Sequence, residues 1–119
     1  MPREGPELTS TGETTVTLRA ANGSSAAAIA GHVTMAMAAA AGFTPLRAER
    51  VRASLAQALG ACTGAVELGL AADPGVLTAR IRAAPEQLAA MGRLLAELSP
   101  ARVDDRLELR FVRPQLDVV

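Results

Sequence analysis

The chain of 119 residues contains no Lys, Trp or Tyr, and it has one Cys, one His and two Phe. Without Lys it cannot use the lysine of a phosphate-binding loop or form a Schiff base through a side-chain amine. A single Cys forms no disulfide within the chain, and one Cys with one His supplies too few ligands for a structural zinc site. With so few aromatic rings, the chain offers no platform on which nucleotide bases could stack.

Charge and hydropathy exclude two further kinds of partner. All twelve basic residues are Arg and twelve acidic residues balance them, so no net field favours nucleic acid or an anionic membrane. A long apolar run at residues 26–42 is mostly Ala, includes His32 and Thr34, and is too short to span a membrane. No basic-then-apolar signal peptide opens the sequence. We therefore expect a cytoplasmic protein that binds neither nucleic acid nor membrane.

Alanine dominates what the chain does contain. Half of the residues are apolar, and 26 residues are Ala. We expect one domain with a thin core, formed by the close approach of Ala-rich helices. A thin core in so small a chain favours a homodimer. The abundance of Ala, Gly and Arg is typical of a GC-rich bacterial genome.

Periodicity and turn residues predict the element order β-α-α-β-α-β-β. Alternating residues indicate strands at 14–20, 76–83, 101–103 and 106–113. Helical spacing indicates helices at 26–41, 46–70 and 85–98. We expect tails at 1–12 and 115–119 around a single domain at 13–114. The fold class follows: an α/β chain of the α+β two-layer sandwich type, with three helices on one face of a mixed, mostly antiparallel sheet.

Several boundaries carry local signals. Ser24 or Ser25 is the predicted cap of the first helix, and Gly42 ends it in a left-handed conformation. Thr44 caps the second helix, with Pro45 at its first position. Because the two helices are joined by so few residues, they are expected to pack as a hairpin.

The predicted helix at 46–70 has an unusual polar face. Its apolar stripe includes Cys62, a buried small side chain in this interpretation. Gly60 and Gly64 lie one turn apart on the opposite side, between Gln57 and Glu67. Each Gly costs about 1 kcal/mol relative to Ala inside a helix. Two such costs on one face suggest that a backbone approaches closely there, or that loops have closed over a lost ligand site.

Residues 58–68 read ALGACTGAVEL, which resembles the E-A-C-T-N-A-V-x-H motif of the serine-kinase anti-sigma factors. These proteins are GHKL-type ATPases with the Bergerat, or histidine-kinase-like, fold. The matching positions are Ala61, Cys62, Thr63, Ala65 and Val66. The lead-in RVRASLAQAL, the closing DDRLELRFVRP and the element order are also similar to the family. The resemblance covers residues 13–114 and implies a Bergerat-like domain without a nucleotide lid.

The departures from the family motif decide what the resemblance implies. Gly60 stands where the family has its catalytic Glu, Gly64 where it has its magnesium-binding Asn, and Leu68 where it has His. Glycine has no side chain to coordinate a metal or take a proton. The family's adenine-reading Asp-x-Gly box is replaced by Ala83-Ala84.

The resemblance thus implies a degenerate member with no catalytic residue, no metal site and no bound ATP or Mg²⁺. Its vestigial nucleotide face would comprise Gln57, Gly60, Gly64, Glu67 and Gly92. The resemblance further implies a regulatory module in transcription that holds a protein partner, a sigma factor or an anti-anti-sigma protein.

Two alternatives remain open. An active ATP-dependent serine kinase would need Gln57 and Glu67 to be recruited in place of the missing residues. A ferredoxin-like small-ligand sensor or structural oligomer would have an apolar groove between the helix hairpin and the sheet. Polar groups that converge in a closed pocket away from Gly60 would favour the sensor.

Overall fold

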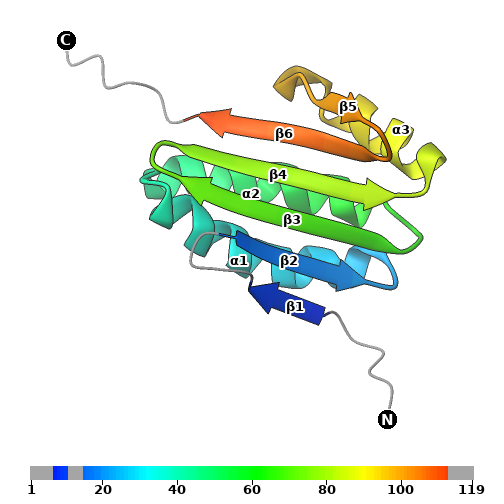
Figure 1. Ribbon diagram of the computed structural model, residues 1–119, viewed down its shortest axis with the longest axis horizontal. Coiled ribbons are helices and arrows are strands. Elements are labelled where there is room, and N and C mark those ends of the chain that lie inside the picture. The colour runs from blue at the N-terminus through cyan, green and yellow to red at the C-terminus, as the bar shows by residue number, and fades with distance from the viewer. Residues whose placement is uncertain (1–6, 11–14, 113–119) are drawn as a thin grey trace.

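The computed structural model describes residues 7–10 and 15–112, which form one six-stranded sheet and its helices (Figure 1). The strands are β1 Glu7–Ser10, β2 Thr15–Ala20, β3 Val66–Asp73, β4 Val76–Ala83, β5 Ala101–Val103 and β6 Arg106–Val112. The helices are α1 Gly23–Ala40, α2 Pro45–Gly60, α3 Pro85–Leu94 and the short 3-10 helix η1 Ala96–Leu98. Every described strand pair is antiparallel, in the order β1-β2-β3-β4-β6-β5.

The helices form a single layer behind the sheet, and the other face of the sheet is open (Figure 1). α1 and α2 pack as a hairpin, with α1 over β2 and β3, while α3 contacts β4 and β6. This arrangement confirms the predicted α+β two-layer sandwich. No helix among residues 7–10 and 15–112 combines the length and apolar character needed to cross a membrane.

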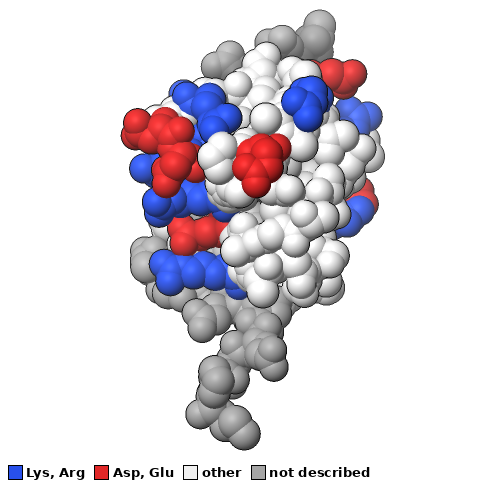
Figure 2. All heavy atoms as spheres, turned by 90° about the vertical axis from the view of Figure 1, so that its right-hand side faces the viewer, with Lys and Arg blue, Asp and Glu red and all other residues white. Residues whose placement is uncertain are grey.

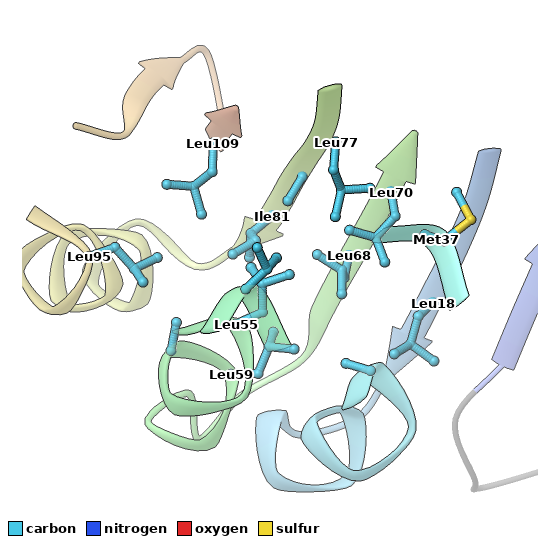
Figure 3. Packing of buried hydrophobic residues seen from close by; sticks show 14 of the residues in the cluster. Leu18, Met37, Leu55, Leu59, Leu68, Leu70, Leu77, Ile81, Leu95 and Leu109 are labelled. Atoms are coloured by element: carbon cyan, nitrogen blue, oxygen red, sulfur yellow. The ribbon is translucent and has the colours of Figure 1, made fainter. Parts of the chain in front are cut away.

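The core lies between the two layers. Leu and Ile side chains of the strands point toward Leu side chains of the helices, and Figure 3 labels Leu18, Leu68, Leu70, Leu77, Ile81 and Leu109 opposite Leu55, Leu59 and Leu95. Burial of each such side chain stabilises the fold by about 1.5–3 kcal/mol. The buried residues of α1 and α2 include five Ala, whose small side chains allow the two helices to approach closely: Ala26, Ala30, Ala38, Ala48 and Ala58.

The predicted helix at 46–70 is wrong after Gly60. α2 ends at Gly60, and β3 begins at Val66 and forms a hairpin with β4 across Pro74-Gly75. Along β3, Val66, Leu68, Leu70 and Ala72 are buried and alternate with more exposed neighbours. A short apolar run satisfies the helical and the strand pattern equally, and here pairing with two neighbouring strands decides it.

The N-terminal region also differs from its prediction. Residues 7–10, predicted to belong to a tail, form β1 and pair with β2. Four residues are too few to show a period of their own, so the strand depends on its neighbour. The remainder of the predicted N-terminal tail and the C-terminal tail at 115–119 lie outside the described residues.

Helix boundaries are mostly as predicted, with two differences. Gly42 has a φ of 92° after α1, and Thr44 accepts a hydrogen bond from the Arg47 N–H at 3.3 Å at the start of α2. α1, however, begins at Gly23 with Asn22 as its cap, because the Asn22 side chain accepts the Ser25 N–H at 2.9 Å. α3 ends at Leu94, and η1 continues to Leu98.

Candidate functional site

The residues of the predicted nucleotide face do not meet in the structure. Gln57 is exposed on α2, Gly60 ends that helix, and Gly64 lies in the following loop. Glu67 lies on the open face of the sheet and pairs with Arg19 at 2.7 Å. Gly92 lies in α3, where an added Cβ would be 3.9 Å from Leu107. The single polar helical face predicted from the sequence is therefore wrong, because the chain leaves the helix after Gly60.

Within the described chain, the expected close approach at the two glycines does not occur. At both Gly60 and Gly64, no atom of the described chain lies within 4 Å of the position that a Cβ would take. The close approach occurs instead at Gly23, where a Cβ would be 1.8 Å from the carbonyl oxygen of Leu59. That contact seats the start of α1 against the end of α2.

The loop after α2 is tied to the first turn of α3. The Thr63 N–H donates to Gln87 Oε1 at 3.0 Å, and Gln87 Nε2 donates to Thr63 Oγ1 at 3.3 Å. A single residue, Ala84, connects β4 to α3. Leu68, at the family's His position, is 1% exposed and faces the helices. The described chain thus joins these elements directly where the resemblance would place a nucleotide.

The open face of the sheet carries a ladder of paired charges. Arg80 Nε lies 2.8 Å from Glu108, and Arg82 Nη2 lies 2.8 Å from Asp105. Figure 2 shows this ladder along its left flank as alternating basic and acidic side chains. The hydrogen bond from Arg82 lowers the pKa of Asp105, and the same bond raises the pKa of Arg82. Exposed pairs of this kind contribute little to stability and are typical of a solvated face.

A groove opens between the helix layer and the end of β6. It has a volume of about 280 Å³. Its walls are formed by Phe43, Arg47, Arg50, Val51, Ser54, Leu98, Arg110, Phe111 and Val112. Both Phe residues of the chain therefore line this groove, although Phe43 lies between α1 and α2 and Phe111 lies in the last strand. We name this site the α2–β6 groove.

Local structure positions the groove residues. The Phe43 N–H donates to the Ala38 carbonyl at 2.9 Å, which closes the end of α1, and Phe43 is buried at 7% exposure. Arg47 and Arg50 are on consecutive turns of α2. Phe111 follows Leu107 and Leu109 on the face of β6 that looks toward the helices. Leu98 of η1, 37% exposed, borders the groove on its remaining side.

The groove combines an apolar floor with unpaired positive charge. Within residues 15–112, the ion pairs involve Arg19, Arg52, Arg80 and Arg82. Arg47, Arg50 and Arg110 have no acidic partner within 4 Å in that part of the chain. Such a site suits a molecule that has an apolar body and negative charge.

Comparison with known proteins gives no identification: no family model, no curated protein and no solved structure matches the chain. The resemblance to the anti-sigma factors stays a prediction from the sequence. Among the described residues, no group of three His, Cys, Asp or Glu side chains is arranged to hold a metal ion.

Sequence reasoning did not identify the residues of the groove, although the sensor alternative placed an apolar groove between the helix hairpin and the sheet. A signal was available, since Phe43 and Phe111 are the only Phe, Tyr or Trp residues of the chain. Arg47 and Arg50 also had the spacing of neighbours on one helical face. Their proximity to β6 depends on tertiary structure, because no local pattern places the start of α2 beside the end of β6.

Proposed function

We propose that this protein is a non-catalytic binding module, which acts by holding another molecule. The observation that carries the proposal is the α2–β6 groove, where Phe43 and Phe111 lie beside three Arg residues without acidic partners in the described chain. Buried apolar contact supplies affinity, and unpaired charges select the partner and speed its association.

The proposed type of module is regulatory and similar to the anti-sigma factors. The element order supports this, since a helix hairpin is followed by a β-hairpin, a helix and a closing β-hairpin. Gly60 and Gly64 offer no side chain for Mg²⁺ or proton transfer. The proposal is therefore that the ATP and Mg²⁺ site has been lost and that a partner protein, of the sigma-factor or anti-anti-sigma type, is held without release by phosphorylation.

Thermal unfolding with and without millimolar ATP and Mg²⁺ tests the lost site. A ligand at a hundred times its Kd adds about 2.7 kcal/mol to the free energy of unfolding. For a domain of this size the unfolding midpoint would rise by roughly 4 °C for each kcal/mol. We expect no rise. A clear upward shift would overturn the proposal and restore the active-kinase alternative.

A small-ligand sensor is the second candidate. It is favoured by Arg47 and Arg50, which lie beside the apolar floor of the groove, away from Gly60. The volume of about 280 Å³ lies just below the range of about 300–1,000 Å³ that is usual for small-molecule sites. Thermal unfolding with decanoate, an apolar carboxylate, tests this candidate, because a saturable rise in midpoint would support it.

A further inference from the structure

Among the described residues, the strand that borders the α2–β6 groove has an unpaired edge. β5 pairs with Arg106, Leu107 and Glu108 of β6, and no strand of the described chain pairs with β6 on that side beyond Glu108. Figure 1 shows the consequence, since β5 covers one half of β6 and leaves the half toward its C-terminal end uncovered. A free edge presents unpaired N–H and C=O groups that can pair with another chain.

Two hairpins establish which peptide groups face this edge. Val103 and Arg106 flank a two-residue turn, so they form a hydrogen-bonded pair, and the backbone groups of Arg106 point toward β5. Along a strand the backbone groups of successive residues point to alternate sides, so every second residue after Arg106 points to this same side. The backbone groups of Arg110 and Val112 consequently point away from β4. The β3–β4 hairpin gives the same result. Asp73 and Val76 flank its two-residue turn, so the backbone groups of Val76 point toward β3 and those of Leu77 point toward β6. Leu77 lies opposite Phe111, so the backbone groups of Phe111 point toward β4 and those of its neighbours Arg110 and Val112 point away from it.

Along the unpaired edge of β6, apolar and charged side chains lie on opposite faces of the sheet. Phe111 faces the helix layer and lines the groove, whereas Arg110 is exposed on the neighbouring position of the strand. An added strand alternates in the same way. A residue of that strand opposite Phe111 would enter the groove, and the residues before and after it would lie on the side of Arg110.

We propose that the partner contributes an extended peptide segment that adds to the edge of β6 at Leu109–Val112. Its central apolar side chain enters the α2–β6 groove, and acidic residues on either side meet Arg110. A further acidic residue, on the groove side of the added strand, meets Arg47 or Arg50. This inference rests on the proposed function as a binding module and adds the chemistry of the partner.

Two other occupants fit less well. In a second copy paired edge to edge at β6, Arg110 of each copy would face the same side of the joined sheet, where like charges are destabilising. A small anion in the groove would meet Arg47 and Arg50 but would leave the charge of Arg110, and the backbone groups of Arg110 and Val112, without partners. A peptide strand can place an apolar side chain on the groove floor, pair its acidic side chains with the Arg residues and hydrogen-bond to the edge of β6 at the same time.

The test is a fluorescence polarisation titration of the full chain with a labelled peptide of sequence GTDLDETG, at low ionic strength. We expect saturable binding. The same peptide with N-methyl groups on its two Asp amides lacks the edge-directed donors, and we expect it to bind about fivefold more weakly for each lost hydrogen bond. Equal binding of the two peptides, or no binding of the parent peptide, would overturn the proposal.

Protein variants separate the edge from the charges. Val112→Pro removes the edge-facing N–H of an exposed residue and is expected to weaken binding about fivefold, whereas Val112→Thr keeps it and has little effect. Arg47→Glu with Arg50→Glu should weaken binding by about tenfold. Arg93→Glu, a single charge reversal at an exposed α3 position, is the control for general charge attraction.

Three outcomes would assign the edge or the groove differently. If Arg93→Glu lost as much affinity as the Arg47→Glu, Arg50→Glu variant, the peptide would be bound by general charge attraction and not at the groove. Displacement of the peptide by decanoate at similar concentrations would assign the groove to small anions. Sedimentation that shows a dimer, dissociated by Val112→Pro, would assign the edge to a second copy. Each of these results would overturn the peptide proposal. None of them would affect the proposed function, because that proposal is tested separately by thermal unfolding with ATP and Mg²⁺.

Discussion

The backbone N–H of Gly23 donates to the carbonyl oxygen of Cys62 at 3.0 Å. This hydrogen bond joins the first residue of α1 to the loop that follows α2. A Cβ at position 23 would lie 1.8 Å from the Leu59 carbonyl oxygen and 2.7 Å from the Cys62 Cβ. Both neighbours are held in place, since Leu59 and Cys62 are buried in the core. The close contact of the helix hairpin therefore requires glycine at this position.

Gly23→Ala is expected to lower the free energy of unfolding by about 3 kcal/mol, because overpacking against backbone atoms cannot be relieved by a side-chain rotation. The shift is measured by urea unfolding, as a lower midpoint at an unchanged m-value. Gly60→Ala is the matched control. Its Cβ meets no described atom within 4 Å, so we expect no loss and a gain of up to about 1 kcal/mol. Equal effects of the two substitutions would contradict this account of the hairpin.

Thr34 is the buried polar side chain of α1, at 0% exposure, and its Oγ1 has no hydrogen-bond partner within the described chain. Thr34→Val replaces the hydroxyl by a methyl group of similar shape. Removal of an unsatisfied buried hydroxyl should raise the free energy of unfolding by about 1 kcal/mol. Thermal unfolding measures the rise. Thr34→Ser retains the hydroxyl and loses the methyl, so this control should be less stable than the parent chain.

Asp105 supplies a prediction on pH. Its hydrogen bond from Arg82 lowers the pKa of the carboxyl below the ordinary value of 3.8. A carboxyl with a lowered pKa stabilises the folded state above its unfolded pKa, and that contribution is lost as pH falls through the folded pKa. Asp105→Asn should therefore be less stable than the parent chain near neutral pH. The difference should shrink as the pH falls below 3.8.

The pKa of Asp105 can be read directly from a carboxyl NMR titration. In Arg82→Ala the titration midpoint should move up toward 3.8, because the hydrogen-bond donor is gone. Arg93→Ala, which removes an exposed charge from α3, should leave the midpoint in place. A midpoint that does not respond to Arg82→Ala would show that the ion pair does not persist in solution.

The contrast between the two ends of α2 explains where sequence reasoning succeeded. Thr44 and Pro45 mark its start with a side-chain cap and a preset φ, both of which act within a few residues. Its end at Gly60 has no comparable mark, because the apolar spacing continues through Val66 and Leu68. Those residues belong to β3, where hydrogen bonds to β2 and β4 outweigh local helical preference.

The candidate site was less accessible from the sequence than the fold. The predicted site depended mainly on residues that share a helical face only if the helix continues to Leu70. Once the chain turns after Gly60, Glu67 moves to the open sheet face and pairs with Arg19 and Arg82. The groove residues were absent from the prediction, since α2 and β6 contribute them jointly.

The sequence by itself determined the α+β class, the helix hairpin and the turn at Asp104-Asp105 between the last two strands. These features follow from periodicity, caps and turn residues, which act over short stretches of chain. Only the tertiary structure decided the end of α2, the edge of β6 that is unpaired among the described residues, and the placement of Phe43 and Phe111 along one groove. These depend on the order of strands in the sheet, and strand order is a property of the whole chain because pairing joins residues that are distant in sequence.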